Sequence, residues 1–447
     1  MKHTSPLIFA VMLFSSMFSV SAFAETLEEA VATTVQNNPE ILAEANRKYS
    51  VDKTVDQARA GYKPTVDLTL GIGFERAKNP STSPDHSSLS RGEAEIRATQ
   101  MLYDGFATKS AIEESLSNAE AAGYQVMGAA EKLSLGTVER YLDVLRREQL
   151  LKYTEDNLTQ HNSLYDKVKL KADSGVGNYT DVAQTTGRLA LAEANLLSAK
   201  GNLTDSKSRY IRYVGHEPEG LVDPIKTCCD DVPSTLDGAL KIAFHEYPDI
   251  LAAVSEHEAS LAQQEGAKAP FHPQINLEAS ASLDNNIDGT RGQNKDALAM
   301  ARLDYNLLNG GADKARLEQT KYLSEQALNR ADGTIREAEK NVRLAWSNVD
   351  SLARRLPILE KRVQAAKLTR DAYSQQFTVG RRTLVDLLDT ENELLAAQNA
   401  YTNVYFDHMY GCYWLSQTMG QLLKRLNVDV PEASIKVADK ATIDEAK

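Results

Sequence analysis

The strongest constraint on the fold of this chain is an internal duplication. A residue pattern near the N-terminus returns at a constant spacing of 209, as for Leu27 and Leu236 (236 − 27). Further along the spacing falls to 205, as for Gly105 and Gly310 (310 − 105), so one copy is four residues shorter (209 − 205) between the matching segments. The matched pairs also include Pro39 with Pro248, Tyr141 with Trp346, Gly175 with Gly380, Asp181 with Asp386 and Gly215 with Gly420. A repeat of this length means that neither half need be a complete fold, so the architecture has to be derived from the repeat unit.

The first residues have the features of a secretory signal peptide. Lys2 precedes an apolar run, 7–20, and Ala22-Phe23-Ala24 fits an A-x-A cleavage site. The run is shorter than the ~20 residues that a membrane helix needs. We therefore interpret residues 1–24 as a signal peptide, 25–220 as repeat 1, 221–234 as a linker, 235–421 as repeat 2 and 422–447 as a polar C-terminal tail.

Composition excludes several classes of function. The formal net charge is −12, which argues against a nucleic-acid partner. The chain has no H-E-x-x-H, C-x-x-C, G-x-S-x-G or phosphate-loop motif, and its eight histidines include no i, i+4 pair. We expect no enzyme and no cofactor.

The three cysteines are Cys228, Cys229 and Cys412. Three cysteines in a chain of 447 residues do not make a disulfide framework. Cys228 and Cys229 lie together in the linker, and we interpret them as loop thiols. A metal site is the alternative, but their sequence neighbourhood supplies too few ligands for it. No Cys follows the signal peptide directly, so the sequence offers no site for an N-terminal lipid.

Long helices are predicted in both repeats. No proline occurs between Pro84 and Pro218, and apolar residues recur there at helical spacing. The pattern predicts helical hairpins over 106–214 and 312–419, with turns at Gly175 and Gly380. A helix of ~68 residues is about 100 Å long, which indicates an extended coiled bundle. Pro357 should kink its helix. Two shorter helices precede the strands of each repeat: 27–37 with 40–60, and 236–246 with 249–267.

Four segments alternate apolar and polar residues with a period of two, which is typical of strands. They span about 64–75, 92–104, 273–284 and 297–308, and each has about the ~10 residues of a transmembrane strand. A half-buried sheet of a soluble protein would show the same alternation. The signal peptide, the long helices and the aromatic residues at the strand ends favour the membrane interpretation.

Four strands are too few to close a barrel, because the smallest single-chain barrels have ~8. An open sheet edge in lipid leaves unpaired backbone groups that cost several kcal/mol each. Several copies must therefore share one barrel. Two copies give eight strands and three give twelve, and the alternation alone does not decide between them.

The pattern resembles the TolC family of outer-membrane channels over essentially all of the mature length. The most specific match is the segment 377–389, in which an aromatic residue precedes Val379-Gly380, an Arg follows, and two Asp lie three apart. The resemblance implies a mainly α fold with a membrane β-barrel. Three copies would share a twelve-stranded barrel in the outer membrane, and the duplicated long hairpins would form a helical tunnel across the periplasm. It also implies a periplasmic adaptor and an inner-membrane ABC or other transporter as partners, with outer-membrane lipid around the barrel.

The resemblance further implies a gate at the helix tips. It assigns Arg382 to a latch that ties one helix pair to its neighbour near Thr180 and Asp181. Phe377 stands where the family archetype has Tyr, so that hydroxyl is missing and closure would depend more on Arg382 or on packing. The alternative for Arg382 is an ordinary surface cation.

Asp386 and Asp389 would line the constriction of the tunnel. They are i, i+3 on one predicted helix and so share a face. Three copies would bring six carboxylates around a narrow axis, which favours cations, and mutual repulsion should raise their apparent pKa values as a coupled set. The alternative is that both lie on a solvated helix face.

The expected function is an outer-membrane exit duct that receives cargo from an inner-membrane transporter. Type I secretion of a large protein, such as an adhesin or toxin, is the preferred cargo class, because the sequence also resembles the agglutination-protein branch of the family and lacks a lipid-attachment Cys. Efflux of drugs or other small molecules is the alternative. A structural coiled-coil protein of the periplasm would explain the helices but not the four strands.

Overall fold

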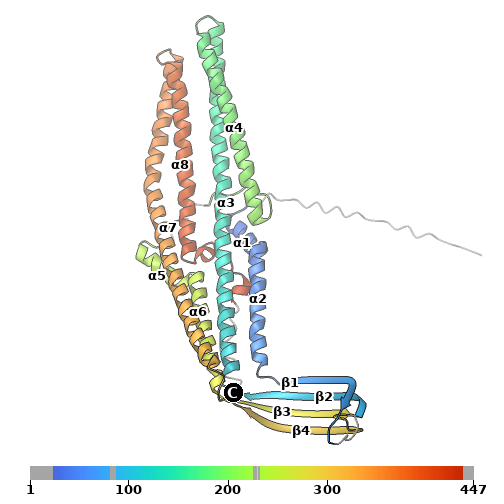
Figure 1. Ribbon diagram of the computed structural model, residues 1–447. Helices are drawn as coiled ribbons and strands as arrows, with labels where there is room; N and C mark the ends of the chain where they lie inside the picture. Colours follow the sequence, from blue (N-terminus) through green and yellow to red (C-terminus); the bar gives the residue numbers. More distant parts are fainter. Residues whose placement is uncertain (1–23, 81–86, 225–228, 230–231, 436–447) are drawn as a thin grey trace, which may run out of the picture.

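The computed structural model describes residues 24–80, 87–224, 229 and 232–435. The predicted signal peptide, apart from Ala24, lies outside the described residues, as do residues 436–447 of the predicted tail. The molecule is elongated, with a four-stranded sheet at one end and the tips of two helical hairpins at the other (Figure 1). The helices between these ends meet near the middle of the molecule, where the main core lies.

Each repeat begins with two short helices, α1 (Leu27–Asn37) and α2 (Pro39–Ala60) in the first, α5 (Leu236–Glu246) and α6 (Pro248–Gly266) in the second. Thr26 and Glu29 form a capping box on α1: the Glu29 N–H donates to the Thr26 hydroxyl at 3.2 Å, and the Thr26 N–H donates to the Glu29 carboxylate at 2.9 Å. Proline stands at the start of α2 and of α6, where its missing N–H has no helical partner to lose.

Two long helical hairpins follow the strands. α3 (Ala107–Asp173) returns as α4 (Tyr179–Val214), and α7 (Ala312–Thr378) returns as α8 (Leu384–Thr418). α3 and α7 have 67 residues each, which corresponds to about 100 Å at 1.5 Å per residue. α7 continues through Pro357 without interruption. In the part of the chain that the structure describes, no helix combines the length and the apolar character needed to cross a bilayer.

The sheet is antiparallel in the order β1-β2-β3-β4. Its strands are β1 (Thr65–Ala77), β2 (Ser87–Tyr103), β3 (Gln274–Asn285) and β4 (Gln293–Asp304). β2 begins five residues before the predicted strand 92–104 (92 − 87), because the polar segment from Ser87 pairs with the end of β1. β4 ends four residues before the predicted position 308 (308 − 304), because Asp304 is already opposite Gln274, the first residue of β3.

The register gathers apolar side chains on one face of the sheet. One row across the strands consists of Leu68, Ile96, Ala281 and Ala297. The neighbouring row consists of Asp67, Arg97, Ser280 and Leu298, so the opposite face is polar except on β4. Nothing in the described part of the chain covers the apolar face: Ile72 is 97% exposed and Phe74 is 94% exposed.

The main core lies where α1, α3, α4 and α8 meet. Tyr141 of α3 is fully buried, and its hydroxyl donates to the Glu25 carbonyl at 2.8 Å and accepts from the Val222 N–H at 2.9 Å. These bonds hold the start of the described chain and the residues after α4 against α3. The duplicated helices therefore share one core with the segments that flank them.

The segment after residue 421 begins inside this core. Leu422 and Leu423, in the short helix α9 (Leu422–Arg425), are at most 1% exposed. Their N–H groups both donate to the carboxylate of Glu131 on α3 at 3.1 Å. The first residues assigned to the polar tail 422–447 are thus apolar and packed, and a second short helix, α10 (Glu432–Ile435), follows them.

One expectation about the cysteines is wrong. Cys229 of the linker forms a disulfide with Cys412 of α8, across 183 residues of sequence and with a Cα–Cα distance of 5.5 Å. Cys229 is therefore not a free loop thiol. Cys229 lies against the buried Cys412 of α8, and the local sequence around Cys228 and Cys229 does not indicate this proximity.

Candidate functional site

The helix tips are formed by two tight turns at corresponding positions of the repeats. Gly175 follows α3 with φ +75°, and Gly380 follows α7 with φ +77°, a conformation that disfavours residues with a side chain. The next helix then begins with a cap: the Thr180 N–H donates to the Asn178 side chain at 3.0 Å, and Thr383 forms a capping box with Asp386 at 3.2 and 3.3 Å. The local sequence thus fixes where both hairpins turn.

The two hairpins of one chain contact each other near these tips. Leu164 and Val168 of α3 pack in one cluster with Leu384, Leu387 and Leu388 of α8. Closer to the turns, the Lys171 ammonium lies 4.7 Å from the centre of the Phe377 ring, a cation–π geometry. Phe377 therefore has a partner on the other hairpin that needs no hydroxyl.

Among the described residues, Arg382 contacts only side chains of its own hairpin. Its Nε donates to the Gln376 side chain at 3.0 Å, its guanidinium lies 4.2 Å from the centre of the Tyr373 ring, and it is 3.9 Å from the Asp386 carboxylate. Within the described single chain, Arg382 is not brought to Thr180 or Asp181. The role of Arg382 as a latch to a neighbouring helix pair stays a prediction.

Asp386 and Asp389 lie one turn apart on α8. Asp386 is held by the Thr383 cap, and the hydrogen bonds from Thr383 and the charge of Arg382 lower its pKa. The expected raised pKa would come from repulsion between the carboxylates of three copies around an axis. The single chain lacks those neighbouring copies, and its local contacts lower the pKa instead. The Asp389 side chain is 64% exposed and lies 3.7 Å from Arg188 of α4.

Sequence reasoning missed two ion pairs near the tips. Arg188 and Asp389 join the first hairpin to the second, although they are 201 residues apart (389 − 188). Arg370 of α7 lies 3.4 Å from Glu391 of α8, and burial raises the pKa of Glu391. Burial and, to a smaller extent, the positive charge of Arg188 lower the pKa of the nearby His161. The i, i+4 charge rule identifies pairs within one helix only, so no local signal indicated these contacts.

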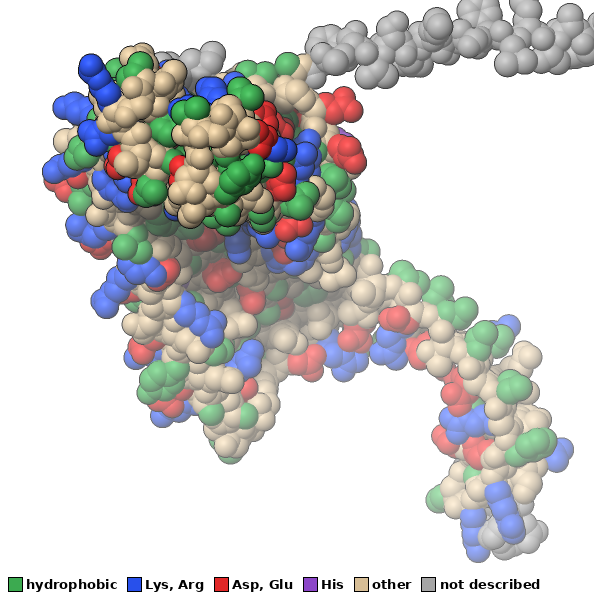
Figure 2. All heavy atoms as spheres, turned by 90° about the horizontal axis from the view of Figure 1, so that it is seen from above, with side chains coloured by type: hydrophobic (Ala, Val, Ile, Leu, Met, Phe, Trp, Pro, Cys, Tyr) green, Lys and Arg blue, Asp and Glu red, His purple; other side chains and the backbone are tan. Residues whose placement is uncertain are grey.

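The surface seen along the helices carries charges of both signs. Figure 2 looks onto the tips, where Lys and Arg side chains alternate with Asp and Glu side chains and with hydrophobic ones. This face has no single dominant charge in the isolated chain. A ring of one sign at the tips would therefore arise only from symmetric copies that repeat Asp386 and Asp389 around an axis.

Comparisons with known proteins give one family. The family model of outer membrane efflux proteins matches residues 31–216 and 239–405. The outer membrane efflux protein BepC of Brucella suis is 27% identical over 434 residues, covering 94% of this chain and 91% of that protein. The outer membrane protein TolC of Vibrio cholerae is 24% identical over 447 residues, covering 98% and 100%. The alkaline protease secretion protein AprF of Pseudomonas aeruginosa is 21% identical over 423 residues, covering 89% of this chain and 84% of that protein.

Solved structures give the same fold. The outer-membrane channel OprN aligns with a TM-score of 0.75 at 20% identity, over 88% of this chain and 89% of that one. The two-part family match corresponds to the two repeats, and such channels are passive conduits rather than enzymes. The chain therefore belongs to the outer membrane efflux protein family, as a TolC-type outer-membrane channel that extends into the periplasm.

Proposed function

We propose that three copies of this chain form one exit duct through the outer membrane. The observation that carries the proposal is the four-stranded sheet with its exposed apolar face. Within the described residues, β1 and β4 each pair with one neighbour only, and each unpaired backbone group in lipid costs several kcal/mol. Pairing of β4 with β1 of the next copy removes both edges, and three copies give a twelve-stranded barrel. Channels of this family form trimers.

The helical hairpins supply the second part of the duct. α3 with α4 and α7 with α8 extend away from the sheet over about 100 Å, and Figure 1 shows their tips at the far end. In the trimer these hairpins form a tunnel across the periplasm. Asp386 and Asp389 line its inner constriction, and Arg382 and Phe377 help to hold the tips closed near Thr180 and Asp181.

The duct has to receive cargo from other proteins. The sequence contains no nucleotide-binding motif, so the energy for export comes from an inner-membrane transporter, and a periplasmic adaptor connects the two. Family members work in such assemblies. For this chain we propose type I secretion of a large protein, supported by its similarity to AprF, whose name refers to protease secretion.

Efflux of small molecules is the second candidate. It is favoured by the similarity to BepC, whose name refers to efflux. Loss of the channel has a different effect in the two cases. Without a protein-secretion duct one exported protein is missing, whereas without an efflux duct toxic small molecules stay inside the cell.

Deletion of the gene separates the two candidates. The exported and surface proteins of the deletion strain are compared with those of the parent, together with tolerance to dyes and bile salts. We expect one large exported protein to disappear while tolerance is unchanged, and the wild-type gene on a plasmid to restore it. An unchanged set of exported proteins with new sensitivity to dyes would contradict secretion and establish efflux.

A further inference from the structure

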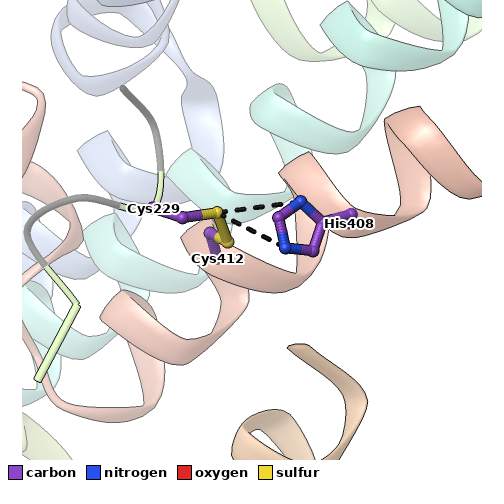
Figure 3. A group of neighbouring side chains, drawn as sticks. All are labelled: Cys229, His408 and Cys412. Carbon is purple, nitrogen blue, oxygen red and sulfur yellow. Dashed lines mark hydrogen bonds between the residues drawn. A yellow bond between two sulfur atoms is a disulfide. The ribbon is translucent and has the colours of Figure 1, made fainter. Parts of the chain in front are cut away.

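The disulfide in the main core lies beside a histidine, so three side chains of the kinds that bind metals are close together there. His408 and Cys412 are i, i+4 on α8 and therefore lie on one face of the helix. Cys412 is fully buried, and Cys229 reaches it from the linker. The Cys229 sulfur lies 3.9 Å from both ring nitrogens of His408, as Figure 3 shows. Three side chains from two distant parts of the chain thus converge at one point.

The distances in this group are close to those of a metal site. One ligand atom from each of Cys229, His408 and Cys412 lies within 4.8 Å of the others. A tetrahedral Zn²⁺ with Zn–S of about 2.3 Å and Zn–N of about 2.0 Å places its ligand atoms roughly 3.3–3.8 Å apart. The 3.9 Å between the Cys229 sulfur and the His408 nitrogens is within a few tenths of an ångström of such a spacing, whereas the two sulfurs have to move apart once the bond between them is reduced. Two sulfurs and one imidazole are also the ligand types that Zn²⁺ and Cu⁺ prefer.

The imidazole is suited to this role. His408 is half-buried beside the two sulfurs, and a neutral imidazole nitrogen is the commonest histidine ligand of a metal. The two sulfurs are suited only when reduced, because a metal binds thiolates and the disulfide has none. The disulfide and the metal therefore exclude each other.

We propose that Cys229, Cys412 and His408 form a redox-exclusive site, which is a disulfide when oxidised and binds one Zn²⁺ or Cu⁺ when a dithiol has reduced it. The dithiol gives two electrons to the Cys229–Cys412 bond and becomes a disulfide itself, and the two cysteines take up two protons. Metal binding then releases those two protons as the thiolates form. The three side chains leave one position of a tetrahedral Zn²⁺ open to water.

The site ties the linker to α8 in both redox states. Cys229 lies in the segment that connects the two repeats, and Cys412 lies in the core that packs α3, α4 and α8 together. Reduction alone would remove the covalent bond between the linker and this core. A bound cation would replace the covalent bond with coordinate bonds between the same two sulfurs and add His408, so the linker would stay in place in a chain that has lost its disulfide.

The test uses the full mature chain purified in detergent, oxidised or reduced with a phosphine under anaerobic conditions. Co²⁺ serves as the spectroscopic probe and Zn²⁺ is titrated against a coloured chelator. We expect one cation per reduced chain, with thiolate-to-cobalt absorption, and none per oxidised chain. The variant His408→Ala should weaken Zn²⁺ binding at least tenfold, and Cys229→Ser should abolish the absorption.

Two variants control for other ligands. His245→Ala removes an exposed histidine on α5, and Cys228→Ser removes the neighbouring thiol. Both should bind Zn²⁺ as the parent chain does. The proposal is overturned if the reduced chain binds no cation, if His408→Ala binds as tightly as the parent, or if Cys228→Ser loses binding. Because Cys412 is buried in the core, it is left unchanged, and circular dichroism checks that each variant is folded.

Discussion

Glu131 is a carboxylic acid in a place that has almost no contact with water. It is 2% exposed, and burial raises its pKa to about 7, although the two N–H donors of α9 act in the opposite direction. A folded chain therefore holds a proton that the unfolded chain releases above its ordinary pKa of 4.5. The free energy of unfolding should fall as the pH rises from about 4.5 to about 7 and then level off.

Replacing this carboxyl with an amide tests the assignment. Glu131→Gln cannot ionise, so it should remove up to about 3 kcal/mol of pH dependence between pH 4.5 and 7, at ~1.4 kcal/mol per unit. The measurement is the free energy of unfolding against pH for the parent and the variant. Glu155→Gln, an exposed position on the same helix, should leave the pH dependence as it is. Equal slopes for parent and Glu131→Gln would show that Glu131 does not titrate in this window.

Asp386 and Asp389 carry the proposed selectivity of the channel. Replacing both with Asn keeps the side-chain volume and removes six negative charges from a trimer, so the preference for cations over anions should be lost. Reversal potentials in planar bilayers under a salt gradient measure this preference. Asp332→Asn, an exposed residue of α7 that lies far along the chain from the tip, serves as the control. A double variant that stays cation-selective would remove these residues from the constriction.

The residues of the disulfide show what a single sequence can reveal about a site. His408 and Cys412 have a spacing that places them on one helix face, and this signal was present in the sequence. Their third partner, Cys229, is 179 residues from His408, and nothing in the sequence near Cys229 indicates that this residue lies against α8. Glu131 was missed for a related reason: a charged residue in a long helix looks solvent-exposed until the segment that covers it is placed.

At the scale of elements, the helices were easier to predict than the strands. Helix ends carry local chemistry, such as the capping box at Thr383 and the left-handed glycine at Gly380. Strand ends depend on the partner strand. Residues 87–91 show no alternation yet extend β2, because β1 continues opposite them, and residues 305–308 alternate but have no β3 residue to pair with.

The contact between the two hairpins gives a prediction at this scale. Arg188–Asp389 joins the hairpins, whereas Arg382 supports the turn of its own hairpin. A partly exposed ion pair contributes about 1 kcal/mol or less, which corresponds to about a fivefold change in a two-state equilibrium. Arg188→Ser and Arg382→Ser should each loosen the closed tips and raise single-channel conductance.

Arg354→Ser is the matched control for both variants. Arg354 is an exposed arginine of α7 that pairs with Asp350 within its own helix, 28 residues before Arg382 (382 − 354). Its replacement should leave the conductance unchanged. If Arg382→Ser lowers the conductance or leaves it as it is, the latch role is refuted, and if only Arg188→Ser raises it, the ion pair between the hairpins is the contact that holds the tips.

At the scale of the whole molecule, a single chain does not complete the sheet that it forms. Within the residues that the structure describes, the sheet has two open edges and an uncovered apolar face, while the helical part has a buried core of its own. The alternation of the strands predicted this incompleteness but not the number of copies, because the side-chain period of two is the same in an eight-stranded and a twelve-stranded barrel. The number depends on the curvature of the closed sheet and on packing between hairpins of different copies.

The central claim is that three chains share one barrel, and native mass measurement of the detergent-extracted protein tests it most directly. Protein purified from outer membranes is compared with the same protein after denaturation, which gives the mass of one mature chain. We expect a native complex of three times that mass, after subtraction of bound detergent and lipid. A complex of two chains would indicate an eight-stranded barrel, and a single chain would contradict any shared barrel.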